Sequence, residues 1–215
     1  MVFAAGLFTP QIMQAQGTLT YLSNLGQPSA GSQGVASNSW MAVGFETGNN
    51  VGGYDLNSVQ LTMTDASGVP SGFTVMLYSQ LAILGHSIPR TNLDTLNGST
   101  DPSIAGIYTY TDGSNFILSP STFYYIVLAA GTATNNGAYQ WSYANTSTYS
   151  SIDGWVAGTP GGYEVSANGL TWGGSSSPFP QYAINATPTP EPSSSWLFLL
   201  CSGIFIYVRR TFRFQ

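Results

Sequence analysis

The sequence predicts an all-β protein, a β-sandwich of the jelly-roll type followed by a single hydrophobic membrane helix at the C-terminus. Apolar and polar residues alternate over short runs, which is the period of a half-buried strand. Gly and Pro, 25 and 12 of the 215 residues, separate these runs at intervals typical of turns. The last part of the chain contains a run of mostly apolar residues from Trp196 to Val208. Together these features indicate one β domain with a tail that enters a membrane.

Residues 1–16 begin the chain with the order of a secretory signal peptide. Val2 to Phe8 is an apolar run, Pro10 breaks it, and a polar stretch ends near Ala15. No Lys or Arg precedes the apolar run, which a truncated start would explain. Cleavage near Ala15 would leave a mature chain from about Gly17. The alternative is that this run forms a buried first strand of the domain.

Residues 17–187 form the predicted β domain. Alternation is clearest around Val59, Leu61 and Met63 and from Phe73 to Leu77. The run 122–130 is apolar on both faces, which predicts a central strand, or a strand whose second face is covered by another element. Further strands are expected at Leu19–Leu25, Trp40–Glu46, Ile107–Thr111, Tyr139–Tyr143 and Tyr182–Ala186.

Turns and loops separate these strands. Residues 81–96 contain Pro89 and are expected to form a long loop with at most one short turn. No helix is expected between the two terminal segments. No repeat of fixed period is present, so a β-sandwich is favoured, with a β-helix as the alternative architecture. Four dipeptides predict turns: Asp112-Gly113, Asn136-Gly137, Asp153-Gly154 and Asn168-Gly169.

The charge content excludes several classes of function. Only 6% of residues are charged, against about 25% in an ordinary soluble domain. Arg90 is the only Lys or Arg before the last seven residues, so the chain cannot neutralise phosphates and nucleic-acid binding is excluded. One His and one Cys remove most metal-site and thiol chemistry. No cofactor and no metal site are expected; calcium at Asp94, Asn97 and Asp101 is the alternative to an ordinary polar loop.

No catalytic residue is expected, and the chain is not predicted to be an enzyme. His86 is the only imidazole, and neither a Gly-x-Ser-x-Gly elbow nor an acidic pattern accompanies it. A glycan-active enzyme would need two carboxylates about 5 to 10 Å apart. Most carboxylates of this chain stand beside Gly, Asn or Ser, where Asp forms turns.

Aromatic residues offer a candidate binding surface. Trp141 shares one strand face with Tyr139 and Tyr143, while Trp155 and Trp172 follow in turn-rich sequence. An exposed ring can stack on the C–H face of a neutral sugar, so Trp141, Trp155 and Trp172 are candidate glycan-binding residues. The alternative is that these rings fill the core, where Trp and Tyr are commonly buried.

The C-terminal segment, residues 188–215, has three parts. Its Pro-rich start favours an extended stalk. The apolar run that follows is about 20 Å long as a helix, and flanking residues with snorkelling Arg side chains extend it toward the roughly 30 Å of a bilayer. Arg209 and Arg210 then place the C-terminus in the cytoplasm. The apolar residues of the expected membrane segment are Trp196, Leu197, Phe198, Leu199, Leu200, Ile204, Phe205, Ile206, Tyr207 and Val208.

This tail resembles the PEP-CTERM sorting signal of Gram-negative bacteria. Pro190, Glu191 and Pro192 match the recognition triplet of that family, and Arg209 and Arg210 match its cytoplasmic stop. The resemblance implies that an exosortase, a membrane-embedded protease, is the partner that recognises and cuts the tail. It also implies an inner-membrane precursor and a final place at the cell surface, the outer membrane or the extracellular matrix.

The domain resembles the choice-of-anchor modules, closest to the type labelled R. The motifs that carry this resemblance run in order along the chain, and the modules are defined by their varied surface anchors rather than by a reaction. The expected function is therefore that of a non-enzymatic surface or biofilm-matrix protein; the alternative is a carbohydrate-binding module for exopolysaccharide. The matching segments are 22–26, Ser39-Trp40, 54–59, 118–125, Trp172 and 182–186.

Overall fold

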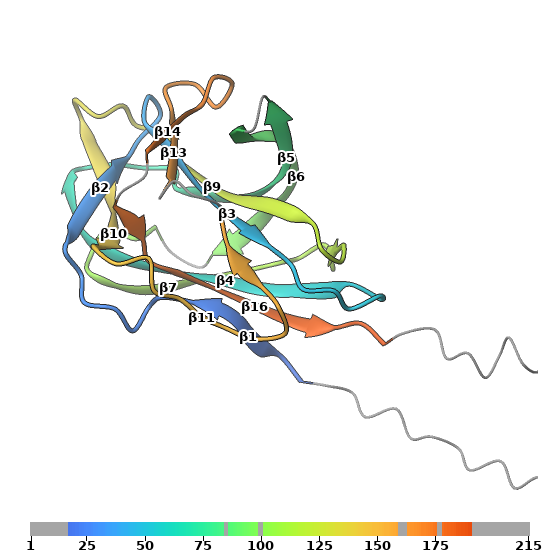
Figure 1. Ribbon diagram of the computed structural model, residues 1–215. Coiled ribbons are helices and arrows are strands. Elements are labelled where there is room, and N and C mark those ends of the chain that lie inside the picture. Colours follow the sequence, from blue (N-terminus) through green and yellow to red (C-terminus); the bar gives the residue numbers. More distant parts are fainter. Residues whose placement is uncertain (1–16, 84–85, 99–100, 159–162, 176–177, 191–215) are drawn as a thin grey trace, which may run out of the picture. The chain divides into compact units, whose positions relative to one another are not determined.

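The computed structural model describes residues 17–83, 86–98, 101–158, 163–175 and 178–190. Thr18–Thr189 forms one compact unit (Figure 1). Every regular element in these ranges is a β-strand, so the all-β prediction is confirmed. The strands are β1 (Leu19–Ser23), β2 (Gly31–Val35), β3 (Trp40–Glu46), β4 (Tyr54–Gly68), β5 (Thr74–Ile83), β6 (His86–Gly98), β7 (Gly106–Thr111), β8 (Ile117–Leu118), β9 (Phe123–Ala129), β10 (Gly137–Ala144), β11 (Ser150–Ser151), β12 (Val156–Ala157), β13 (Tyr163–Ser166), β14 (Gly173–Ser175), β15 (Phe179–Pro180) and β16 (Tyr182–Pro188).

The predicted signal peptide and the predicted membrane segment lie outside the described residues. Among the residues that are described, no helix is long and apolar enough to cross a bilayer.

The long strand β4 organises the first half of the sheet. Its alternating pattern buries Val59, Leu61 and Met63 on one face, as the period-two spacing predicts. It pairs with β16, with β7 and, toward its end, with β10. β1 and β11 extend the sheet beyond β16, and β2 and β15 pair with β10.

The second half has the strand order β6-β5-β9-β3-β13-β14. β9 is its central strand, and Tyr124 to Ala129 are buried on both faces, which confirms the prediction from the run 122–130. β9 pairs with β3 on one side and β5 on the other, all antiparallel. A strand covered on both faces requires a second layer on each side.

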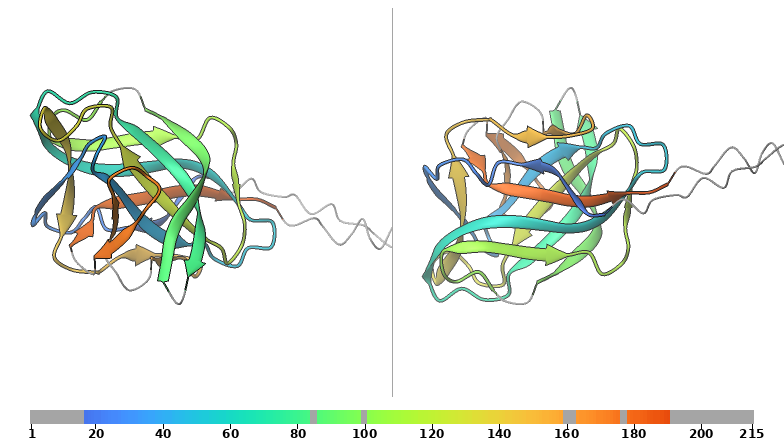
Figure 2. Two further views of the ribbon diagram at one scale, coloured as in Figure 1. Left: turned by 90° about the horizontal axis from the view of Figure 1, so that it is seen from above. Right: turned by 90° about the horizontal axis from the view of Figure 1, so that it is seen from below.

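β6 joins the two halves into one curled antiparallel sheet. It pairs with β5 along most of its length, while Asn97 and Gly98 at its end pair with β7. The two halves therefore face each other (Figure 2). Between them lies the main core, to which both halves contribute: Val59, Leu61 and Ile184 come from the first, and Val43, Phe45, Val75, Leu77, Ile126 and Leu128 from the second.

The prediction of a loop over residues 81–96 is wrong, because most of this segment is the β5–β6 hairpin. β6 has no apolar alternation, since most of its side chains are exposed and only Pro89 and Leu96 are buried. Pro89 lies opposite Gln80, beside an irregular stretch of the register. Proline fits at such irregular positions because it donates no ladder hydrogen bond.

The expected turns lie between strands. Asp153 and Gly154 both have positive φ, 51° and 76°, which is the backbone of a type I′ turn. Gly169 has φ 73° and closes the bend between β13 and β14.

Both ends of the domain lie at one edge of the sheet. β1 and β16 are antiparallel neighbours, so Leu19 lies opposite Ala186. Beyond β16 the backbone N–H of Thr189 donates to the Gly53 carbonyl at 3.0 Å, and Asn50 Nδ2 donates to the Thr189 carbonyl at 3.0 Å. The chain is thus held by hydrogen bonds up to the residue before Pro190.

Candidate functional site

The three tryptophans predicted to bind glycan are buried in the structure. Trp141 has no exposed surface, and its Nε1 donates to the Gln181 carbonyl at 2.9 Å. Trp155 is 1% exposed and stacks on Phe45, with ring centroids 5.7 Å apart. Trp172 is 9% exposed. Sugar stacking needs an open ring face, so the glycan-binding hypothesis for these rings is wrong and the core-packing alternative holds.

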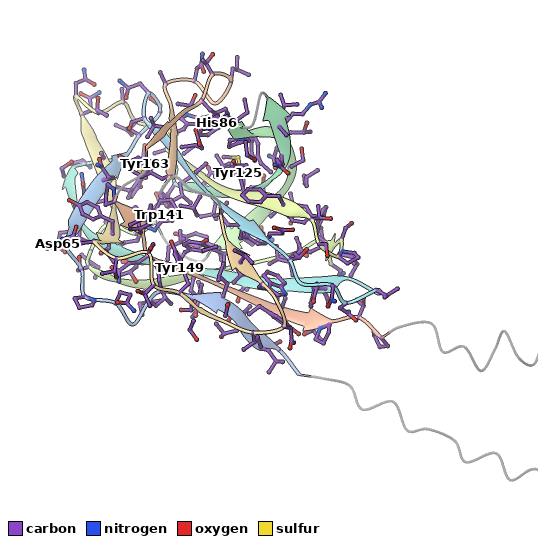
Figure 3. All side chains as sticks on the ribbon, in the orientation of Figure 1. Asp65, His86, Tyr125, Trp141, Tyr149 and Tyr163 are labelled. Atoms are coloured by element: carbon purple, nitrogen blue, oxygen red, sulfur yellow. The ribbon has the colours of Figure 1, made fainter. Side chains whose placement is uncertain are left out.

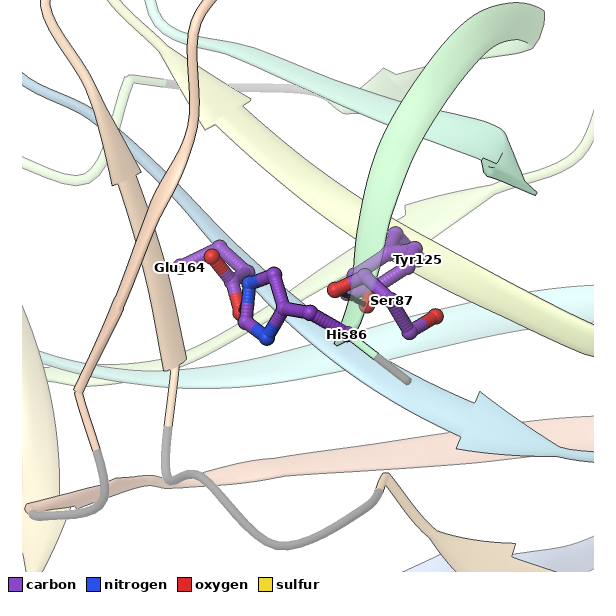
Figure 4. Close-up of polar contacts among 4 residues, drawn as sticks. All are labelled: His86, Ser87, Tyr125 and Glu164. Atoms are coloured by element: carbon purple, nitrogen blue, oxygen red, sulfur yellow. Dashed lines mark hydrogen bonds and ion pairs between the residues drawn. The ribbon is translucent and has the colours of Figure 1, made fainter. Parts of the chain in front are cut away.

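A polar cluster that the sequence did not predict lies on the outer face of the second half of the sheet. The register aligns Glu164 on β13 with Ala42, and Ala42 with Val127 on β9. His86 begins β6 at the tip of the β5–β6 hairpin, and its Nε2 lies 3.3 Å from Glu164 Oε1 (Figure 4). Two residues 78 positions apart therefore form an ion pair when the imidazole is protonated.

Burial determines the electrostatics of this pair. The Glu164 side chain is 7% exposed, whereas that of His86 is 56% exposed. Burial raises the pKa of the Glu164 carboxyl, and the nearby His86 partly opposes the rise. Gly174 lies opposite Glu164 on β14, where a Cβ atom would come within 2.8 Å of Oε1. Glycine at this position leaves room for the carboxylate beneath the imidazole.

Tyr125 binds Ser87, the residue after His86 in the hairpin, on the same outer face of the sheet. Its hydroxyl donates to the Ser87 carbonyl at 2.6 Å, and burial raises its pKa to about 12. His86 and Tyr125 lie at the same end of the domain (Figure 3). Among the described residues, Ser87 Oγ, Glu164 Oε2 and Trp172 Nε1 are buried without a hydrogen-bond partner.

This cluster has the composition but not the geometry of a Ser-His-acid triad. His86 Nε2 faces the carboxylate, and no hydrogen bond joins Ser87 Oγ to the imidazole in the described structure. A triad needs the hydroxyl on one ring nitrogen and the acid on the other. The arrangement instead fastens the hairpin tip to the sheet face.

A second pair of acids lies where β6 crosses between the two halves. The carboxyl groups of Asp94 and Asp112 are within hydrogen-bonding reach of each other. Burial, and then the contact with Asp112, raise the pKa of Asp94. Burial also acts to raise the pKa of Asp112, but hydrogen bonds from the backbone N–H groups of Ser114 and Phe116 outweigh it and lower the pKa. Asp94 therefore takes up a proton before Asp112 does as the pH falls.

The two acidic residues of the hypothetical calcium loop have different partners. Asp94 faces Asp112, while Asp101 accepts a hydrogen bond from the Tyr139 hydroxyl at 2.7 Å. Among the described residues, no group of three or more His, Cys, Asp or Glu side chains could hold a metal ion. Two carboxyls within hydrogen-bonding reach of each other are also closer than the roughly 5 Å that even a retaining glycosidase needs.

A pocket of about 350 Å³ opens beside this crossing. The sequence alone does not indicate this pocket, because its wall forms only where residues of three strands come together. Its lining residues are Phe73, Thr74, Thr95, Leu96, Asn97, Gly98, Asp101 and Tyr110.

Only the first residue of the predicted sorting signal belongs to the part of the chain that the structure describes. Pro190 is described and exposed, while Glu191, Pro192, Arg209 and Arg210 lie outside the described residues. Comparisons with protein-family models, curated proteins and solved structures gave no match to this chain.

Proposed function

We propose that this chain is an exported surface or extracellular-matrix protein of a Gram-negative bacterium, whose β domain is sorted through its C-terminal tail by an exosortase. The observation that carries the proposal is the order of parts in residues 188–215: the triplet Pro190 to Pro192, an apolar segment, and Arg209 with Arg210. An extended, proline-rich triplet suits a protease cleft because proline prevents helix formation there.

The arrangement of the chain ends supports this proposal. Leu19 and Ala186 are cross-strand neighbours, so a signal segment and a sorting tail would leave the domain from one edge. Both could engage the same membrane without the chain passing around the domain. We further infer that the curled sheet is a jelly-roll-like β-sandwich, because its halves enclose a shared core.

Processing in cells tests the proposal. The full chain is produced in a Gram-negative host with and without an exosortase, and its size and location are followed by immunoblot of cell fractions. The host with exosortase is expected to convert the precursor to a shorter form that leaves the inner membrane. Glu191→Ala and Pro190→Ala are expected to block this conversion.

Pro188→Ala is the matched control, because it changes a proline of the same segment outside the triplet. This variant is expected to be processed like the unmodified chain. Equal processing with and without exosortase, or normal processing of Glu191→Ala, would contradict the proposal.

A further inference from the structure

The pocket beside the β6 crossing has aromatic walls. Phe73 is half-buried, and its ring centroid lies 5.7 Å from that of Tyr110 and 5.0 Å from that of Tyr139. Phe73 and Tyr110 both line the pocket, together with Leu96. The main core continues behind them, since Tyr110 and Tyr139 belong to it. Tyr110 is only 4% exposed, so Phe73 supplies the ring face of the pocket that can pack against the C–H face of a sugar ring.

The remaining lining groups form hydrogen bonds. They are the amide of Asn97, the carboxylate of Asp101, and the hydroxyls of Thr74 and Thr95. Asp101 Oδ2 already accepts from Tyr139, which fixes the carboxylate in place. Donors and acceptors therefore surround an apolar face, which is the usual composition of a specific small-molecule site.

The hydroxyl of Tyr110 is a polar group that the described residues leave unsatisfied. Tyr110 is 4% exposed, and its Oη atom has no hydrogen-bond partner among them. A buried hydroxyl without a partner costs about 1 to 3 kcal/mol, so native structures rarely leave one without a reason. Burial, and then the negative charge of Asp101, raise the pKa of this hydroxyl, so it stays protonated and able to donate.

The charge of the pocket narrows the class of ligand. Asp101 is the only acidic side chain in the lining, and the lining contains no Lys, Arg or His. An anionic ligand would meet one carboxylate and no compensating cation. A purely apolar ligand would leave the amide, the carboxylate and the hydroxyls without partners.

We propose that this pocket binds a neutral saccharide unit, with the half-buried ring of Phe73 against a sugar ring and Asn97, Asp101 and the Tyr110 hydroxyl bonded to its hydroxyls. A volume of about 350 Å³ limits the bound part to one or two sugar rings. The site is distinct from the three buried tryptophans, and it does not depend on how the tail is processed.

Ligand-detected NMR and calorimetric titration of the purified full chain test this proposal. The probes are glucose, galactose, mannose and cellobiose, with glucuronic acid as the anionic comparator and choline as the cationic one. We expect saturable binding of at least one neutral sugar and weaker binding of glucuronic acid. Asn97→Ala and Tyr110→Phe are each expected to weaken the binding about tenfold.

Matched controls lie on the same two strands. Thr91→Ala changes an exposed polar residue of β6 outside the pocket, and Tyr108→Phe removes a hydroxyl of β7 that donates to the Ile104 carbonyl. Both controls are expected to bind sugar as the unmodified chain does, with unchanged far-ultraviolet circular dichroism in all four variants.

Three results would overturn the proposal. The first is no saturable binding of any neutral sugar up to ~50 mM, where a millimolar site would be filled. The second is tighter binding of choline than of any sugar, which would assign the aromatic walls and Asp101 to a cation. The third is equal sugar affinity of Tyr110→Phe, Asn97→Ala and their controls.

Discussion

Glu164 lies beneath His86 on a covered sheet face, and its burial predicts a dependence of stability on pH. The pKa of Glu164 is raised in the folded protein, so its contribution to stability is fully present below the unfolded pKa of about 4.3. That contribution is lost as the pH rises through the raised folded pKa. Glu164→Gln cannot ionise, so its free energy of unfolding is expected to fall less over this pH range than that of the unmodified protein.

Urea denaturation at a series of pH values measures this difference. His86→Ala serves as the second variant, because the imidazole lowers the pKa of Glu164 and its removal should extend the loss of stability to higher pH. Identical pH profiles for Glu164→Gln and the unmodified protein would show that this carboxylate is not the titrating group.

The different surroundings of Asp94 and Asp112 predict that the same substitution, Asp→Asn, changes the free energy of unfolding unequally at the two positions. Asp94→Asn replaces a buried carboxyl beside Asp112 with an uncharged amide, so the unfolding free energy at neutral pH should stay the same or rise. Asp112→Asn weakens the acceptor for Ser114 N–H, 2.7 Å away, and for Phe116 N–H, at a cost of roughly 1 to 2 kcal/mol. Urea denaturation of both variants compares the two losses, and a larger loss in Asp94→Asn would contradict the opposite directions of the two pKa shifts.

At the level of elements, the β5–β6 hairpin is attached to the sheet face by few contacts at its tip. Tyr125→Phe removes the hydrogen bond to the Ser87 carbonyl, which is worth about 1 kcal/mol. We expect the amides of residues 86–88 and of Arg90 to exchange with solvent roughly fivefold faster, with little change in overall stability. Hydrogen exchange measured by mass spectrometry reports both quantities.

Tyr78→Phe is the matched control for the hairpin, because among the described residues the Tyr78 hydroxyl donates only to the sulfur of Met76, at 4.0 Å. Its hairpin amides should exchange at the rate of the unmodified protein. Equal protection in Tyr125→Phe and Tyr78→Phe would show that the Ser87 contact does not hold the hairpin.

A comparison of β3 with β6 of this hairpin shows how much of the fold the sequence could predict. β3 was predicted at its observed bounds, Trp40–Glu46, because its apolar residues stand out against polar flanks. β6 was missed because it is mostly exposed, so its sequence carries no apolar period. Strand pairing holds it in place, and pairing is a long-range property that periodicity does not reveal.

The candidate sites likewise divide into features that local sequence predicts and features that depend on long-range pairing. Composition and the tail could be interpreted locally, but Glu164 and His86 meet only through the register of β13 with β3 and the curl of β6. The burial of Trp141 likewise depends on which sheet face becomes the inside. The alternation of Tyr139, Trp141 and Tyr143 was compatible with either a core or a binding face, and the tertiary structure decided between them.

At the scale of the whole molecule, the position where the folded domain ends is compatible with the proposed cleavage of the tail. Thr189 is hydrogen-bonded to Gly53 and Asn50, so the domain ends immediately before the triplet that begins at Pro190. A cut within the triplet would therefore leave the sheet complete and remove only the tail. The low charge of the remaining domain, with Arg90 as its single Lys or Arg, is unchanged by that cut.

The most direct test of the proposed sorting is the intact mass of the mature protein, purified from the surface fraction of cells that contain an exosortase. The proposal predicts a chain that begins near Gly17 and ends within Pro190 to Pro192. A surface protein that retains its residues through Gln215 would contradict it.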